Sequence, residues 1–152
     1  TQNLAKVGPP KFSDEEIAFA RRLQAPLMEE FGSQFPLAID DRVHPLEAQP
    51  ESTKGSTDVG DISWRVPTGG LGTTCFMAES PGHSWQNVAC IGSTIGEKGI
   101  LYAAKVLAVT AVDLLQDEQL LAATRADWQK RMQDRTYFSF DPHAQKAPEK
   151  IR

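Results

Sequence analysis

Two short segments concentrate the residue types that could carry chemistry. Residues 55–61 hold two carboxylates, Asp58 and Asp61, directly before a predicted strand. Residues 81–85 hold His83, which follows Pro-Gly in a loop at the end of another predicted strand. Ligands tend to bind open α/β sheets at the ends of strands, and a neutral imidazole is a common metal ligand. His83 is therefore a candidate metal ligand that projects into a crevice.

Simpler roles compete with this chemistry. A loop aspartate commonly caps a turn with its own side chain, which is the plainer role for Asp58 or Asp61. A loop histidine such as His83 is more often a surface or hydrogen-bonding residue than a ligand. His44 and His143 carry no predicted role. The residue types alone leave both interpretations open.

Two other kinds of site are disfavoured by their motifs. Residues 68–72 are glycine-rich but lack the Gly-Lys-Ser/Thr ending of a phosphate-binding loop, so a nucleotide site is not expected. They are expected to form a flexible hairpin connection, with close backbone approach to a substrate as the alternative. Ser84 has no GxSxG elbow around it, which disfavours a serine nucleophile.

Composition narrows the class of protein. The chain has 152 residues, enough for one domain with a core but short for a two-domain enzyme. Its net charge of -4 disfavours general nucleic-acid binding, which needs clustered Lys and Arg. Cys75 and Cys90 match no metal or redox spacing and are expected to be buried thiols. No signal-peptide pattern opens the sequence, so a cytoplasmic location is expected.

Helices and short strands are expected to position the candidate residues. Ser13 and Glu16 form a capping-box pattern that starts a helix ending near Gly32, which Pro26 kinks or shortens. Strands are predicted at residues 35–39, 62–66 and 73–78, with a further short strand or loop floor at residues 88–91.

Two helices are predicted after the strands. Residues 97–115 are apolar nearly all round, as in a core helix, and their most apolar part, residues 101–115, is too short for a membrane span. Asp117 caps a second helix that continues through Arg131. This order of elements predicts an α/β fold, and so apolar a helix implies further strands from elsewhere.

Taken together, the motifs resemble one family. In order they are residues 55–64 (GSTDVGDISW), residues 67–68 (PT), residues 81–85 (PGHSW) and the helix with residues 98–100 (KGI). Their order and spacing are similar to the aminoacylase and carboxypeptidase-type metallopeptidases, in the branch of the aminobenzoyl-glutamate utilization protein B. The likeness extends from about Val7 through the second C-terminal helix.

The resemblance implies a fold and a chemistry. The fold is the C-terminal portion of a mixed-sheet, helix-flanked α/β metallopeptidase catalytic domain, interrupted in sequence by a smaller lid and dimerisation domain. The chemistry is metal-dependent hydrolysis of the amide of N-acyl or aminobenzoyl amino acids at two divalent ions, zinc or manganese. His83 matches the family's last metal ligand. Asp58 and Asp61 match a segment near the site, as substrate contacts or as residues that orient the ligands.

Two features of the family pattern are not found in the sequence. No upstream metal motif and no general-base glutamate are found, so no catalytic residue is assigned and most ligands of the ions are expected outside this chain. The expected organisation is a linker at 1–12 after an absent lid domain, catalytic-domain residues at 13–134, and a tail at 135–152.

The expected partners are the N-terminal part of the catalytic domain, a second copy in a homodimer of the full enzyme, and a small-molecule amide. Neither nucleic acid nor a membrane is expected. By itself the chain is expected to be inactive. The alternative is a non-catalytic binding or assembly module, because one candidate ligand does not make an active centre, and a self-sufficient small hydrolase is the least favoured hypothesis.

Overall fold

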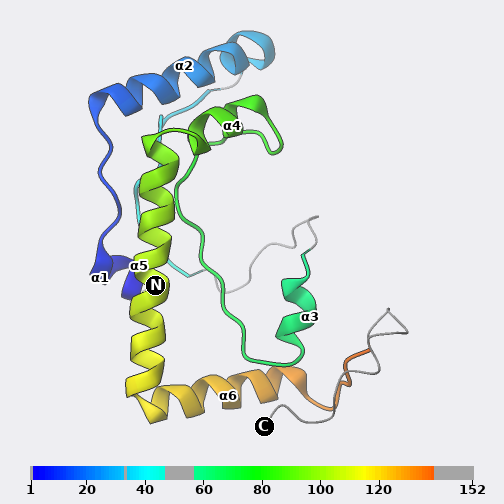
Figure 1. Cartoon of the computed structure of the whole chain (residues 1–152). Helices are drawn as coiled ribbons and strands as arrows, with labels where there is room; N and C mark the ends of the chain where they lie inside the picture. Colours follow the sequence, from blue (N-terminus) through cyan, green and yellow to red (C-terminus); the bar gives the residue numbers. More distant parts are fainter. Residues whose placement is uncertain (1, 33, 47–56, 139–152) are drawn as a thin grey trace. The chain divides into compact units, whose positions relative to one another are not determined.

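The computed structural model describes residues 2–32, 34–46 and 57–138, and six helices lie within them (Figure 1). The helices are α1 (Gln2–Val7), α2 (Asp14–Phe31), α3 (Val59–Ser63), α4 (Trp85–Ile91), α5 (Thr94–Gln116) and α6 (Glu118–Met132). The chain divides into two compact units. The first comprises Thr1–Gln49 with Leu71–Asp113, and the second comprises Pro50–Gly70 with Leu114–Arg152.

Helix α2 begins and ends where its sequence predicts. The Ser13 hydroxyl accepts from the Glu16 amide at 3.3 Å, and the Glu16 carboxylate accepts from the Ser13 amide at 2.7 Å. This reciprocal capping box satisfies two of the amides that a helix start leaves unpaired. Gly32 closes the helix in the left-handed conformation that glycine adopts without steric cost. Pro26 lies inside the helix and does not end it.

The core of the first unit forms between α2, α4, the start of α5 and two extended segments. Its buried apolar residues are Ala20, Leu23, Leu27, Phe35, Ala38, Ile39, Met77, Cys90 and Ile95. Each leucine, isoleucine, phenylalanine or methionine buried in this way contributes about 1.5–3 kcal/mol. The core therefore anchors residues 73–78 and α4, the two elements on either side of His83.

A buried polar residue ties the two extended segments to α2. The Gln24 side chain is fully buried, and its amide nitrogen donates to the Leu37 carbonyl at 2.9 Å and the Ala78 carbonyl at 3.2 Å. The Ala78 amide also donates to the Ala38 carbonyl at 2.8 Å. Because a buried amide without partners is costly, these bonds fix where the chain enters the His83 loop.

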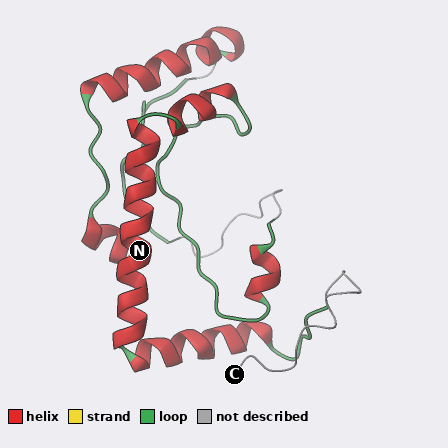
Figure 2. Ribbon diagram, viewed as in Figure 1, coloured by secondary structure: helices red, strands yellow, loops and turns green. Residues whose placement is uncertain are grey.

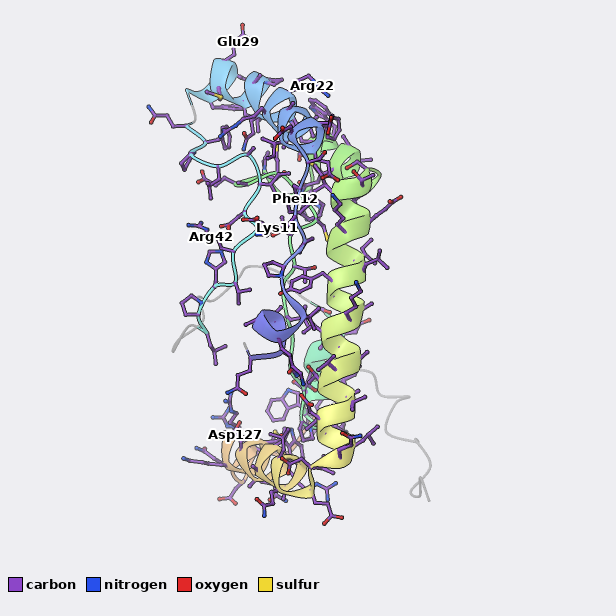
Figure 3. All side chains as sticks on the ribbon, turned by 90° about the vertical axis from the view of Figure 1, so that its left-hand side faces the viewer. Lys11, Phe12, Arg22, Glu29, Arg42 and Asp127 are labelled. Carbon is purple, nitrogen blue, oxygen red and sulfur yellow. The ribbon has the colours of Figure 1, made fainter. Side chains whose placement is uncertain are left out.

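Helix α5 is held to the first unit along one face. Lys98 Nζ donates to the Glu16 carboxylate on α2 at 2.6 Å and lies 5.6 Å from the centre of the Phe12 ring, which Figure 3 labels. Further along, the Tyr102 hydroxyl donates to the Leu4 carbonyl at 2.7 Å, and the Asn3 amide donates to Asp113 at 2.8 Å. Helices α1 and α2 thus secure this face of α5.

The second unit is built on an aromatic cluster. Trp128 of α6 donates its indole N–H to the Ser63 carbonyl of α3 at 2.7 Å. The Trp64 and Tyr137 ring centroids lie 6.2 Å apart, and the Arg65 guanidinium lies 4.8 Å from the centre of the Tyr137 ring. Aromatic and cation–π pairs of this kind contribute about 0.5–1.5 kcal/mol each. They attach α3 to α6.

The prediction of an α/β mixed-sheet fold is wrong, because the described part of the chain is helical. The described residues contain helices and loops and no strand (Figure 2). Residues 62–66 complete α3 and a turn, with the Ser63 hydroxyl donating to the Gly60 carbonyl at 2.6 Å. Residues 88–91 belong to α4, because the Ser84 side chain caps a helix start.

The other two predicted strands are extended but form no ladder. Residues 35–39 and 73–78 share a single backbone hydrogen bond, from Ala78 to Ala38. Side chains donate hydrogen bonds to nearby backbone carbonyls instead: the Gln24 amide donates to the Leu37 carbonyl, and the Thr74 hydroxyl donates to the Asp40 carbonyl. Alternating apolar residues predict an extended chain, whereas a strand also requires a partner for its backbone groups.

The predictions for the C-terminal helices and for the cysteines have definite outcomes. The helices expected at 97–115 and 117–131 are confirmed as α5 and α6, and the Asp117 side chain accepts from the Leu120 amide at 2.9 Å. Cys90 is buried, which raises the pKa of its thiol, but Cys75 is only half-buried. The predicted domain boundaries stay predictions. Helix α1 lies within 1–12, and residues 139–152 of the expected tail lie outside the described residues.

Helix α5 is less buried than a core helix. Only 17% of its most apolar stretch is buried within the described structure, and the full helix of 23 residues is long and apolar enough to cross a membrane by length and composition. Length and composition alone are weak evidence, because core helices pass the same test. The exposed side of α5 therefore requires a separate explanation.

Candidate functional site

His83 is the candidate metal ligand, and its backbone is in an unusual conformation. Its φ of 56° lies in the left-handed region, which non-glycine residues rarely adopt. Such a conformation costs on the order of 1–3 kcal/mol and persists only where the surrounding structure enforces it. Residues of this kind cluster at functional sites, but Glu79 (φ 54°) and Gln133 (φ 51°) share the conformation, so it is consistent with a role for His83 without identifying one.

The loop that carries His83 is fixed to the start of α4. The Ser84 hydroxyl caps the helix by accepting from the Asn87 amide at 3.3 Å. The Asn87 side chain then donates to the Pro81 carbonyl at 3.1 Å and accepts from the Ser80 hydroxyl. These bonds bracket His83 from both sides and impose its backbone conformation.

The imidazole of His83 is available to an external partner. Its residue is exposed, and among the described residues the ring makes no hydrogen bond or ion pair. An exposed imidazole on a fixed loop can donate one nitrogen to a divalent ion. The structure therefore leaves open the role that the sequence predicts for His83.

Asp58, directly before α3, and Asp61, within α3, lie in the second unit. Asp58 precedes the helix, but its side chain makes no capping hydrogen bond. The Asp61 carboxylate accepts from the Tyr137 hydroxyl at 2.9 Å. Both residues are exposed. The simple capping role is thus absent for Asp58, while the substrate-binding role of both aspartates stays a prediction.

The described residues do not form a complete metal site. In the described ranges no group of three or more His, Cys, Asp or Glu side chains is arranged to hold an ion. His83 belongs to the first unit and the two aspartates to the second. The family resemblance implies two ions, and among the described residues His83 is the one that it matches to a metal ligand.

A cluster around Asp40 was missed by the sequence analysis. The Asp40 carboxylate accepts from Arg42 at 2.8 and 2.7 Å and contacts His44 Nε2 at 3.0 Å (Arg42 is labelled in Figure 3). The hydrogen bonds from Arg42 hold the pKa of Asp40 well below its usual range. The signal was the alternation of Asp, Arg and His in an extended segment, which places all three on one side.

Two hollows accompany these features. A cavity of about 190 Å³ in the first unit is lined by Asp40 and residues 73–78. A second, of about 390 Å³, is lined in the second unit by Trp64, Arg65, Trp128 and Tyr137, among others. Neither cavity is lined by His83, Asp58 or Asp61.

Comparison with known proteins identifies a relative. The chain is 34% identical over 149 residues to one of the subunits of the p-aminobenzoyl-glutamate hydrolase of Escherichia coli (strain K12). The match covers 85% of this chain and 31% of that protein, so the chain spans about a third of the length of its relative. This similarity confirms the closeness to this branch that the motifs predicted. No family model and no solved structure matches the chain.

Proposed function

Because the chain is close to the aminobenzoyl-glutamate hydrolase branch of the aminoacylase and carboxypeptidase-type metallopeptidases, we propose that it forms the C-terminal part of a metal-dependent amidohydrolase. The substrates are the amides of N-acyl or aminobenzoyl amino acids. The observation that carries the proposal is the exposed imidazole of His83 within the motif Pro-Gly-His-Ser-Trp, which makes no hydrogen bond or ion pair with the residues that the structure describes.

In this proposal His83 holds a divalent ion, and the Ser84 and Asn87 bonds fix the backbone of the loop that carries the ring before the ion binds. A pre-positioned ligand loses little conformational entropy on binding. Two zinc or manganese ions would supply Lewis-acid polarisation of the scissile carbonyl and a nucleophilic water of lowered pKa. Asp58 and Asp61 contact the substrate or orient ligands from α3.

The remaining ligands and the general base come from polypeptide equivalent to the rest of the relative. The proposed assembly is a cytoplasmic homodimer of the complete enzyme that acts on a small-molecule amide. The described residues hold no cluster of three or more candidate ligands, so we expect the isolated chain to bind metal weakly and to hydrolyse nothing.

The test is reconstitution. The full chain is co-expressed with the part of the E. coli relative that the match does not cover, and release of p-aminobenzoate from p-aminobenzoyl-glutamate is followed. We expect metal-dependent hydrolysis that falls at least about a hundredfold in His83→Asn, because asparagine tolerates a positive φ but replaces the imidazole. His44→Asn is the matched control, since His44 is exposed in the same unit and is assigned no ligand role. Equal activity of His83→Asn and the unsubstituted chain would refute the assignment.

The second candidate function is a non-catalytic assembly module. It is favoured by the absence of a three-ligand cluster in the described ranges. Under this alternative, the chain associates with its partner whether or not metal is present. The assembly then hydrolyses no amide, whether it contains the unsubstituted chain, His83→Asn or His44→Asn. The same reconstitution separates the two functions.

A further inference from the structure

Helix α5 carries an apolar surface that its own unit leaves open. Within residues 100–112 the exposed positions on this side are Ile100, Leu101, Ala104, Leu107, Ala108, Ala111 and Val112, which we call the α5 stripe. At 3.6 residues per turn these positions fall within an arc of about 140° and a length of about 18 Å. The charged residue in this range, Lys105, lies at the border of the arc.

Exposure on this scale is unusual. Leu107 is 55% exposed, Leu101 is 59% exposed and Ile100 is 54% exposed. Single exposed apolar residues are normal, but a continuous stripe of them marks an interaction surface. Covering such side chains gains about 25 cal/mol for each Å² removed from water.

The opposite face of α5 shows that the helix is anchored in a folded unit. Tyr102 and Val106 are buried, and the Asn3 amide donates to Asp113 at 2.8 Å on that side. Lys98 is paired with Glu16 of α2 at 2.6 Å. A helix that spans a bilayer would have to break these polar contacts or carry them into hydrocarbon, which is costly. The anchored face therefore favours a protein partner over a membrane.

The extent of the similarity identifies that partner. The match covers 31% of the hydrolase subunit, so most of the polypeptide that accompanies this segment in the relative has no counterpart in this chain. We propose that the α5 stripe is the docking surface for polypeptide equivalent to that uncovered part. The occupant presents a complementary apolar face without charged groups opposite the stripe. This inference rests on the proposed function for the identity of the partner.

The test measures capture. The full chain, carrying an affinity tag, is co-expressed with the uncovered part of the E. coli relative, and the amount that co-purifies is quantified. We expect capture by the unsubstituted chain and at least a tenfold loss with Leu107→Glu. The matched control is Leu121→Glu, because Leu121 of α6 is 53% exposed and lies outside the stripe, and we expect capture within twofold of the unsubstituted chain.

A second measurement guards against misfolding. Leu107 is exposed, so the far-ultraviolet circular dichroism of Leu107→Glu alone should match that of the unsubstituted chain. In addition, a Leu107→Cys thiol should react rapidly with maleimide in the isolated chain and at least tenfold more slowly in the co-purified assembly.

Several results overturn the proposal: no capture by the unsubstituted chain, undiminished capture by Leu107→Glu, or equal losses in Leu107→Glu and Leu121→Glu. Binding of the chain to phosphatidylcholine vesicles that Leu107→Glu abolishes would assign the stripe to a membrane instead. A dimer of the isolated chain that Leu107→Glu abolishes would assign the stripe to a second copy.

The failure of this proposal can be distinguished from failure of the proposed function. Capture without hydrolysis contradicts the proposed function alone, whereas hydrolysis that is unaffected by Leu107→Glu contradicts the docking surface alone.

Discussion

His83 combines an exposed imidazole with a backbone that its residue type does not prefer. The Pro-Gly-His-Ser-Trp motif identified the residue, but its positive φ is a consequence of the Ser84 cap and the Asn87 bonds on both sides of it. Single residues upstream and downstream thus fix the backbone of the loop at His83. This makes the strain at His83 a measurable property of the folded chain.

The strain predicts a ranking of substitutions at position 83. His83→Val should lower the free energy of unfolding of the isolated chain by about 1–2 kcal/mol relative to His83→Asn, because a β-branched residue at positive φ is strongly disfavoured. His83→Asn itself should lie within about 0.5 kcal/mol of the unsubstituted chain, since histidine and asparagine are both among the non-glycine residues that adopt a positive φ most readily. Urea unfolding followed by circular dichroism measures both. Equal stabilities of the valine and asparagine variants would show that the loop relaxes and stores no strain.

Asp40 predicts a pH dependence. Hydrogen bonds from Arg42 lower the pKa of the folded carboxyl, so its contribution to stability is present above the pKa of the unfolded chain, near 4. That contribution is lost as the pH falls from about 4 toward the lower folded pKa. Thermal unfolding between about pH 6 and pH 2 should therefore show a loss that is smaller in Asp40→Asn.

The neighbouring Asp41 provides the control for Asp40. Its contact is an exposed pair with Lys11 at 3.3 Å, and exposed pairs contribute little. Asp41→Asn should therefore keep the acid-induced loss of the unsubstituted chain. If Asp40→Asn and the unsubstituted chain lose stability in parallel, the Asp40 cluster makes no contribution.

At the scale of elements, α5 lies so close to residues 73–75 that position 99 has no room for a side chain. A Cβ added at Gly99 would lie 2.3 Å from the Thr74 carbonyl oxygen and 2.5 Å from Cys75 Sγ. The Thr73 hydroxyl also donates to the Gly99 carbonyl at 3.1 Å. Gly99 therefore sets the packing distance between α5 and the segment that leads to His83.

Gly99→Ala should destabilise the first unit by about 1–3 kcal/mol, because the added methyl meets backbone that cannot move without displacing the segment. Gly60→Ala is the matched control. A Cβ at Gly60 meets nothing within 4 Å, and alanine is favoured over glycine in a helix by about 0.5–1 kcal/mol. Chemical denaturation of both variants checks the prediction, and a neutral Gly99→Ala would mean that α5 is not closely packed at this point.

Elements could be predicted where local signals were sufficient. The Ser13 capping box, the Gly32 stop and the Asp117 cap are local, and α2 and α6 begin and end accordingly. Residues 73–78 alternate in a way typical of strands, yet a single backbone hydrogen bond, from the Ala78 amide to the Ala38 carbonyl, links them to residues 35–39. Strand formation depends on partners distant in sequence, which a pattern of apolar residues does not supply.

At the scale of the whole molecule, the expectation that most ligands of the ions lie outside this chain stays a prediction. The motifs predicted one metal ligand in this chain, and in the described ranges no three candidate ligands lie together. The Asp40 cluster escaped prediction because its residue types carry no specific signal. The exposure of the α5 stripe was not predicted either. A helix that is apolar on most sides predicts burial, but its sequence does not indicate which polypeptide covers it.

The proposed role of His83 is tested most directly by the metal content of the co-purified assembly of this chain with the part of the E. coli relative that the match does not cover. After dialysis against zinc or manganese at limiting free concentration, we predict two ions per assembly. We predict a clear loss of bound metal in His83→Asn and no loss in His44→Asn. Full metal occupancy in His83→Asn would contradict the claim that His83 donates a ligand.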